Sequence, residues 1–280
     1  MGASGKFCAV QLRDCQTRYP ILLVHGTGFR DVKGISYWGR IPKALEAHGA
    51  AVFFGGQDSW ATVEKNAEAL KRRVLEILQQ TGCEKVNIIA HSKGGLEARY
   101  LASSLGMGQS IASITMISTP NRGSKTMDVL ARLPKALFRI AGWFVNGWCR
   151  LIGDKHPDFF HACFQFTTGW AAAFNEANPD AEGVVYRSYA GVMRSCRSDM
   201  LMWWPNFVIS LFEGENDGLV TPESARWTGF QEVWRGVGGR GVSHMDEVDV
   251  RRRPLTYRGE SFDLVDCYIK MAAELKLQGL

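Results

Sequence analysis

A serine between small residues at position 92 offers the clearest chemistry in this 280-residue chain. An apolar, β-branched run at 86–90 leads directly into Ala90-His91-Ser92-Lys93-Gly94, and a helical pattern follows. The nucleophile motif Gly-x-Ser-x-Gly displays a serine in this way, on a strand-to-helix turn so sharp that bulky neighbours would collide with the backbone. Ala90 is a small departure from that motif, and a serine in this context can also be a simple helix N-cap.

Residues that could activate this serine follow it in the chain. A serine hydroxyl is a weak nucleophile at neutral pH and needs a histidine as base, which a carboxylate in turn orients. His244 lies in a glycine-rich loop and is the only histidine after Asp217. Asp217 follows an apolar run at 208–212, which we interpret as a strand. The order Ser92, Asp217, His244 is the order found in α/β-hydrolases.

Two alternatives to Asp217 remain at this point. Glu213 and Glu215 lie two to four residues before it and could supply the carboxylate. The tripeptide at 216–218, Asn-Asp-Gly, is also a strong turn signal, so Asp217 could be a solvated turn residue. His244 could likewise be an ordinary residue of a surface loop.

Acyl transfer also needs backbone N–H groups that stabilise the developing oxyanion. One donor is expected from Lys93, directly after the nucleophile. The other is expected from Thr27, in the loop His25-Gly26-Thr27-Gly28 that follows an early apolar run. Glycine-rich loops more often serve only as turns, so this loop gains meaning mainly from its combination with Ser92.

Apolar runs and helical patterns alternate along the chain, which predicts an α/β fold with a mostly parallel sheet covered by helices on both faces. The chain contains no repeat or linker that would divide it, so we expect a single domain over 1–280. Expected strands are 20–24, 50–54, 86–90, 111–117, 184–189 and 208–212, and expected helices are 41–48, 62–80, 95–105 and 261–275.

Residues 126–176 interrupt this alternation with a helical insertion. Its apolar stripe recurs every three or four positions and includes Trp143, Phe144 and Trp148. Such a stripe is usually core packing. Because the insertion follows a strand next to the serine turn, we favour the inner face of a cap, or lid, over an acyl pocket. An amphipathic lid could also contact a lipid surface transiently.

Composition excludes several classes of function. The net charge of +5 is dispersed, and its densest cluster, 251–253, is only three arginines long, which disfavours nucleic-acid binding. No apolar run reaches the roughly 18 residues of a membrane span. Seven scattered cysteines without a Cys-x-x-Cys pair indicate free thiols. The N-terminal residues lack a secretory leader, so we expect a cytoplasmic protein, or a secreted one if a leader has been removed.

Six short motifs, in order, resemble those of bacterial triacylglycerol lipases of the Pseudomonas and Burkholderia type. They lie at 19–28, 37–42, 91–100, 118–124, 216–220 and 243–248. The resemblance implies an α/β-hydrolase fold, a Ser92–Asp217–His244 triad and an oxyanion hole at Thr27 and Lys93.

The same resemblance implies a structural calcium ion near the histidine loop. Asp246 matches one carboxylate of that site, and Asp199 is a looser match for the other, although loop aspartates are commonly just solvated. No cofactor is expected for catalysis. We therefore expect a serine-dependent carboxylic ester hydrolase that acts on lipid or acyl esters through an acyl-enzyme. An acyltransferase or thioesterase with the same triad is the alternative, and a non-catalytic acyl-binding protein is a more distant one.

Overall fold

Six parallel strands form the central sheet in the order β2-β1-β3-β4-β5-β6. This computed structural model describes residues 13–30 and 36–280. The first twelve residues, in which we expect no secretory leader, therefore lie outside the described residues. The strands are β1 (Ile21–Val24), β2 (Val52–Phe54), β3 (Val86–His91), β4 (Ile111–Ile117), β5 (Val185–Gly191) and β6 (Phe230–Trp234). The predicted α/β fold is confirmed.

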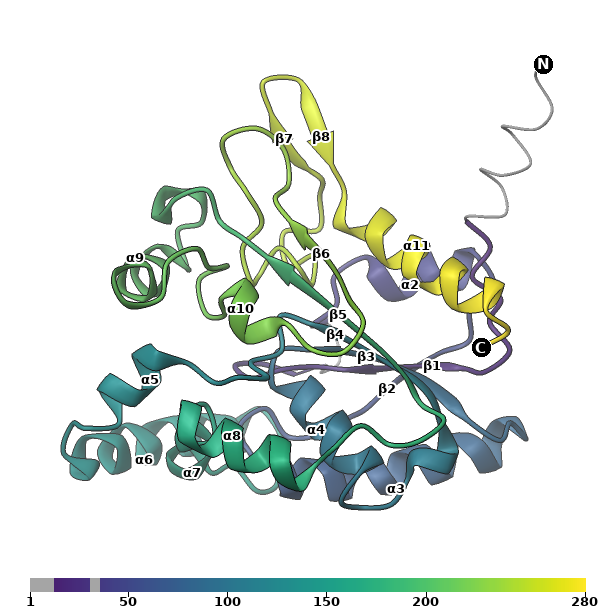
Figure 1. Ribbon diagram of the computed structural model, residues 1–280, viewed down its shortest axis with the longest axis horizontal. Helices are drawn as coiled ribbons and strands as arrows, with labels where there is room; N and C mark the ends of the chain where they lie inside the picture. Colours follow the sequence, from purple (N-terminus) through teal and green to yellow (C-terminus); the bar gives the residue numbers. More distant parts are fainter. Residues whose placement is uncertain (1–12, 31–35) are drawn as a thin grey trace.

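Helices cover both faces of the sheet (Figure 1). Helices α2 and α11 pack on one face, and α3 and α4 pack on the other. The helices are α2 (Ile41–Ala47), α3 (Val63–Thr81), α4 (Lys93–Ala102), α5 (Lys125–Leu130), α6 (Lys135–Leu151), α7 (Phe159–Phe164), α8 (Thr168–Ala177), α9 (Trp203–Phe212), α10 (Pro222–Ala225) and α11 (Leu264–Leu277), with 3₁₀ turns η1 (Gly108–Ser110) and η2 (Cys196–Ser198).

The buried strands explain why the core has two halves. Successive side chains of a strand point to opposite faces, so Leu23 packs with α2 and α11 whereas Leu22 packs with α3 and α4. Strands β1, β3 and β4 are buried along their whole length. A strand covered on both sides reads as a continuous apolar run, which is why these three were predictable.

The insertion is helical, as predicted, and comprises α5 to α8. Helix α6 buries only Gly142 and Cys149. Its apolar side chains are instead exposed to solvent, with Trp143 73% and Leu151 82% exposed. The apolar stripe of α6 is therefore not core packing. In Figure 1, α5, α6 and α9 lie on the left, on the same side of the molecule.

One strand prediction is wrong. Residues 208–212 belong to helix α9, which begins at Trp203. A short apolar run fits a buried strand and a buried piece of helix equally well, because neither then shows a clear period of polar residues. Here the run continues the apolar segment that precedes it, and together they form a helix with large side chains facing outward.

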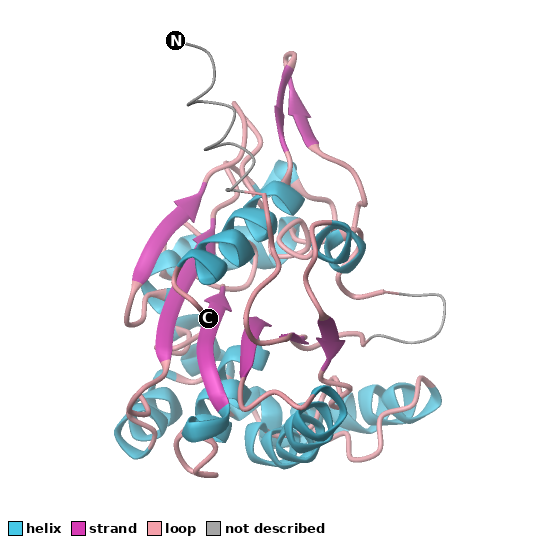
Figure 2. Ribbon diagram, turned by 90° about the vertical axis from the view of Figure 1, so that its right-hand side faces the viewer, coloured by secondary structure: helices cyan, strands magenta, loops and turns pink. Residues whose placement is uncertain are grey.

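The sixth strand of the sheet, β6, was not expected. It is an edge strand in which Gln231 and Glu232 are exposed, so it lacks the continuous apolar character of a buried strand. A second, two-stranded antiparallel sheet, β7 (Leu255–Tyr257) and β8 (Glu260–Phe262), follows it in the chain. Figure 2 shows this hairpin standing away from the rest of the fold.

Two compositional predictions hold within the described residues. No helix there is both long and apolar enough to cross a membrane. The described cysteines are all free thiols: Cys15, Cys83, Cys149, Cys163, Cys196 and Cys267.

The helical conformation of α9 has a direct test in two neighbouring substitutions. Ile209 is 6% exposed and Leu211 65% exposed, whereas in a strand both side chains would share one face. We expect Ile209→Ala to lower the free energy of unfolding by about 2–4 kcal/mol and Leu211→Ala to change it by less than about 0.5 kcal/mol. Urea denaturation followed by circular dichroism measures both, and equal losses would contradict the helix.

Candidate active site

Ser92 stands on a strained turn between β3 and α4. Its backbone angles, φ 54° and ψ −130°, lie where few L-residues are found. The strain is held by the sheet, because the Ser92 N–H donates to the carbonyl of Ile117, at the end of β4, over 2.9 Å. Such strain is typical of functional sites. The helix begins directly at Lys93, two residues earlier than expected from the sequence.

Three glycines allow this turn to approach its neighbours. A Cβ on Gly26 would lie 2.6 Å from the Cβ of Ser92. A Cβ on Gly94 would lie 2.6 Å from two backbone carbonyl oxygens of β1 and the following loop, and one on Gly95 would lie 2.0 Å from Oγ1 of Thr119. At each of these three positions a side chain would collide with its neighbours.

Asp217 and His244 meet beside this turn. Nδ1 of His244 lies 2.8 Å from Oδ2 of Asp217, and the His244 N–H donates to the Asp217 carbonyl over 2.8 Å. The imidazole of His244 lies 4.3 Å, between ring centroids, from that of His91, the residue before Ser92. The structure thus brings Asp217 and His244 together, and the His244 ring lies beside the residue that directly precedes Ser92.

The carboxylate of Asp217 is held rigidly although it follows a helix and not a strand. Its Oδ1 accepts the N–H groups of Leu219 and Val220, each over 2.8 Å. The Met193 N–H, just beyond β5, donates to the carbonyl of Asn216 over 3.0 Å. Asp217 therefore lies at the carboxyl end of the sheet by a different route from the one expected.

The two rival carboxylates have other partners. Oε1 of Glu213 accepts the Ser124 hydroxyl over 2.7 Å and the Thr126 N–H over 2.8 Å, at the start of α5. Glu215 forms a two-bond ion pair with Arg235 at 2.8 and 2.9 Å on the surface. Of the three candidate carboxylates, Asp217 is the one that contacts His244.

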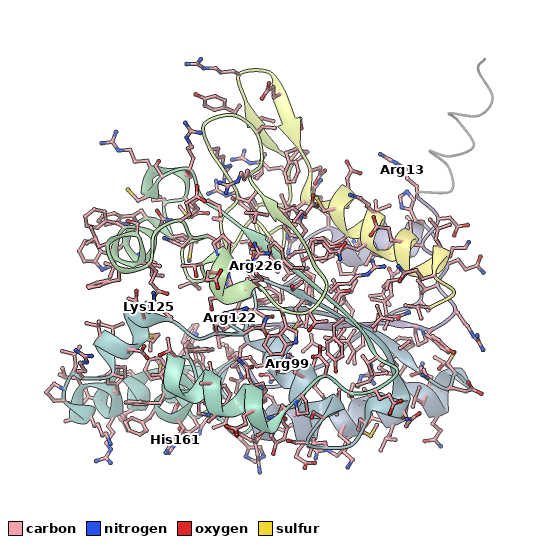
Figure 3. All side chains as sticks on the ribbon, in the orientation of Figure 1. Arg13, Arg99, Arg122, Lys125, His161 and Arg226 are labelled. Carbon is pink, nitrogen blue, oxygen red and sulfur yellow. The ribbon has the colours of Figure 1, made fainter. Side chains whose placement is uncertain are left out.

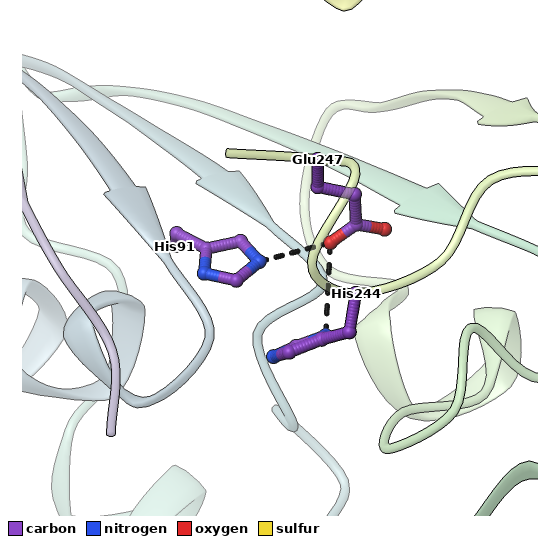
Figure 4. A group of neighbouring side chains, drawn as sticks. All are labelled: His91, His244 and Glu247. Carbon is purple, nitrogen blue, oxygen red and sulfur yellow. Dashed lines mark hydrogen bonds and ion pairs between the residues drawn. The ribbon is translucent and has the colours of Figure 1, made fainter. Parts of the chain in front are cut away.

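A second buried histidine–carboxylate pair lies next to the triad and was missed in the sequence (Figure 4). Nε2 of His91 lies 2.9 Å from Oε2 of Glu247, which is itself 3.7 Å from Nδ1 of His244. The Ser118 hydroxyl donates to the other Glu247 oxygen over 2.7 Å. Burial raises the pKa of Glu247, and the nearby charge of Asp217 raises it further. Burial also lowers the pKa of His91.

Tyr37 connects this pair to the predicted oxyanion loop. Its hydroxyl lies 2.7 Å from Nδ1 of His91 and accepts the Gly26 N–H over 3.0 Å. Gly26 packs against Ser92 and directly precedes Thr27. The loop that carries Thr27 is therefore fixed to the turn that carries Ser92. Tyr37 and Glu247 both lie in motifs visible in the sequence, but nothing there indicated their contacts.

The side chain of Lys93 has a structural function. Its Nζ is fully buried, donates to the Ala61 carbonyl over 2.7 Å and forms an ion pair with the buried Glu97 one turn along α4. The Asn66 amide donates to the same Glu97 oxygen over 2.7 Å. Only the backbone N–H of Lys93 is thus available for the predicted oxyanion hole.

Arg99 connects α4 to the loop after β4 and to Trp227. Figure 3 labels it close to Arg122 and Arg226 in that view. Its Nη1 donates to Oδ1 of Asn121 over 3.1 Å, and its guanidinium lies 3.6 Å from the ring centroid of Trp227. Burial lowers the pKa of Arg99 to about 10.

The carboxylates of Asp199 and Asp246 do come together, but with arginines between them. Arg251 donates to Asp199 over 2.9 Å and pairs with Asp246 at 3.1 Å. Arg240 holds both oxygens of Asp246, at 2.9 and 3.1 Å. A calcium ion needs six to eight oxygen ligands with free lone pairs. These residues therefore do not fit the expected calcium site.

A cavity of about 520 Å³ lies behind the acid loop, between η2 and α9. Its walls include Met193, Asn206 and Asn216, but no residue of the insertion helices and no member of the triad. This cavity is therefore distinct from the acyl pocket expected beside Ser92.

The structural function of the Lys93 side chain can be tested separately from its backbone. We expect Lys93→Met to lower the free energy of unfolding by about 3–5 kcal/mol, because it leaves Glu97 buried without its cation. The double variant Lys93→Met/Glu97→Leu should recover most of that loss. Thermal and urea melts measure both variants, and a double variant no more stable than the single one would contradict this function.

Comparisons with known proteins agree with the fold and the motifs. The family model for the alpha/beta hydrolase fold matches residues 19–191. A triacylglycerol lipase of Pseudomonas fragi is 30% identical over 297 residues, covering 94% of this chain and 98% of the relative. A triacylglycerol lipase of Pseudarthrobacter phenanthrenivorans is 35% identical over 178 residues, which cover 59% of this chain. The match spans 55%, or about half, of the length of that relative.

A solved structure shows the same architecture. The lipase of Staphylococcus hyicus, at 17% identity, matches with a TM-score of 0.70 over 94% of this chain and 97% of that one. The fold, the family model and the near full-length match to the Pseudomonas fragi protein all lead to one conclusion. The chain belongs to the bacterial triacylglycerol lipases of the α/β-hydrolase superfamily.

Proposed function

We propose that this protein hydrolyses carboxylic esters of lipids through an acyl-enzyme on Ser92. The observation that carries the proposal is the 2.8 Å contact between Asp217 and His244 beside the strained Ser92 turn. A buried carboxylate that holds one imidazole nitrogen leaves the other nitrogen to act as a base.

In the proposed reaction, Nδ1–H of His244 donates to Asp217, and Nε2 takes the proton from the Ser92 hydroxyl as its oxygen attacks the ester carbonyl. The tetrahedral intermediate collapses, the alkoxide leaves with the proton from Nε2, and the acyl group remains on Ser92. Water then attacks the acyl-enzyme by the same steps and releases the acid. The Asp217 carboxylate stabilises the imidazolium that forms in each half-reaction.

The oxyanion is assigned to the backbone N–H groups of Thr27 and Lys93. A donor that is already in position lowers the barrier because no reorganisation is needed in the transition state. The fixed Gly26 backbone and the start of α4 support this assignment. No organic or redox cofactor has a place in this chemistry.

Replacement of the nucleophile is the primary test. We expect Ser92→Ala to lower kcat for p-nitrophenyl butyrate by roughly five to six orders of magnitude, because no other group can form the acyl-enzyme. The melting temperature should not fall. Ser103→Ala, at the other end of α4, is the matched control and should keep full activity.

The same assay separates the proposed hydrolase from its alternatives. The wild-type protein should hydrolyse p-nitrophenyl esters and react with a fluorophosphonate probe at Ser92. Transfer of acyl groups to an added alcohol faster than to water, or a strong preference for acyl-CoA, would instead indicate an acyltransferase or a thioesterase. Failure of the probe to label the folded protein would indicate an acyl-binding protein.

The exposed apolar surfaces of α6 and α9 support contact with a lipid surface. Trp143 is 73% exposed on α6, and Trp204 is 57% exposed on α9. Met200, just before α9, is 85% exposed. Exposed clusters of large apolar side chains, as on each of these helices, typically mark an interaction site. We include α6 in the lid and propose that both helices rest on the aggregated lipid that contains the substrate.

Removal of two of these aromatic side chains should weaken lipid contact without changing the chemistry. We expect Trp143→Ala/Trp204→Ala to bind phosphatidylcholine vesicles at least about tenfold more weakly, since each side chain loses apolar burial. Co-flotation in the Ser92→Ala background measures binding. In the active protein, turnover of emulsified triolein should fall, whereas turnover of soluble p-nitrophenyl acetate should not. Leu75→Ala, exposed on α3, is the control, and an equal loss there would contradict the proposal.

A further inference from the structure

The four carboxylate oxygens of Asp199 and Asp246 all accept hydrogen bonds from the chain. Oδ1 of Asp199 accepts the Leu201 N–H over 2.8 Å, and its Oδ2 accepts the Ser243 hydroxyl over 2.7 Å and Arg251 over 2.9 Å. Oδ1 of Asp246 lies 3.1 Å from Nε of Arg251. Oδ2 of Asp246 accepts Arg240 over 2.9 Å and the Ser243 N–H over 3.1 Å.

The charges of this cluster balance without an ion. Both carboxylates are 3% exposed, and two guanidinium groups face them. Isolated charges at such depth would be costly, so a partner of opposite charge is required. A divalent cation placed between the carboxylates would be repelled by both arginines and would find every carboxylate oxygen already accepting from a donor of the chain.

Arg251 is suited to bridge two carboxylates. A planar guanidinium presents donors in a fixed fork, so one side chain can reach Asp199 through Nη2 and Asp246 through Nε. Arg251 also opens the only run of three arginines in the chain, to which the proposed function gives no role.

We propose that Arg251 takes the place of the calcium ion that the family resemblance implies. The chain itself supplies the cation, so the fold of the histidine loop does not depend on calcium. Arg251 connects three segments that meet here: the segment after η2, the histidine loop and the segment before β7.

This cluster also positions His244. Ser243, the preceding residue, is bound through its hydroxyl to Asp199 and through its N–H to Asp246. Arg251 holds both of those carboxylates and so fixes the backbone from which the His244 imidazole extends. It is a positioning residue, since it acts through Ser243. This second half of the inference rests on the proposed function, whereas calcium independence does not.

The first test uses the wild-type protein. Its melting temperature is measured in EGTA and in millimolar calcium chloride, with magnesium chloride as the control for ionic strength. We expect the same melting temperature in all three. A rise of several degrees that is specific to calcium would overturn the proposal, because a ligand that binds the folded state must stabilise it.

The second test compares three arginine variants. We expect Arg251→Gln to lower the melting temperature and to lower kcat for p-nitrophenyl butyrate roughly tenfold to a hundredfold, because small displacements of a catalytic group have effects of that size. KM should stay within about twofold, since Arg251 does not contribute to the binding of the substrate. Arg253→Gln, which removes the same charge from an exposed position, should change neither quantity. Arg251→Lys should recover part of kcat.

Each outcome has one meaning. If Arg251→Gln melts lower but keeps the kcat of Arg253→Gln, Arg251 stabilises the fold without positioning His244, and that half of the proposal fails. If Arg251→Gln cannot be purified folded, the calcium measurement on the wild-type protein still decides the first half. Hydrolysis that survives Ser92→Ala would refute the proposed function and leave the calcium result unaffected.

Discussion

The backbone of Ser92 is the constraint on which the rest of the site depends. Its φ of 54° costs about 1–3 kcal/mol for a residue with a side chain, and it persists only where the surroundings leave no alternative. Here β3 is hydrogen-bonded on both sides, by β1 and β4, and the helix that follows is packed beneath the sheet. Gly26 and Gly94 lack side chains because this turn presses the backbones together. The position of Ser92 is therefore a property of the whole sheet.

His244 is held by hydrogen bonds between loops at the carboxyl end of the sheet. The backbone and the imidazole of His244 both bond to Asp217, so the loops after β5 and β6 are joined to each other. Glu247, three residues along the chain, connects the same loop to His91 and Ser118, at the ends of β3 and β4. Buried polar networks of this kind are rigid because each unsatisfied group in a medium of low dielectric would be costly. The segments that carry Ser92 and His244 thus share one hydrogen-bonded framework.

The sequence was sufficient where local pattern and burial coincide. Strand β3 is buried on both faces and reads as a continuous apolar run, and the order of serine, aspartate and histidine restricted the triad before any contact was known. The sequence was insufficient where a residue's environment is set by distant segments. Val208 and its neighbours have strand-like composition but lie in a helix, and β6 is a half-exposed edge strand without an apolar pattern. The contacts of Arg251 with Asp199 join residues separated by 52 positions, and no local pattern reports such a pairing.

Glu213 joins the apolar helix α9 to the start of the insertion. Glu213 ends α9, and its carboxylate caps the first turn of α5 through Ser124 and Thr126. Asp217 lies four residues farther along the same loop. Contact with an apolar phase would remove the exposed aromatic side chains of α6 and α9 from water. That burial is favourable by about 25 cal/mol of free energy for each Å² of apolar surface. The buried charges near His244 have the opposite property, because they need a dry and fixed environment. The Glu213 carboxylate therefore joins α9, which carries exposed aromatic side chains, to the first helix of the insertion, four residues before Asp217.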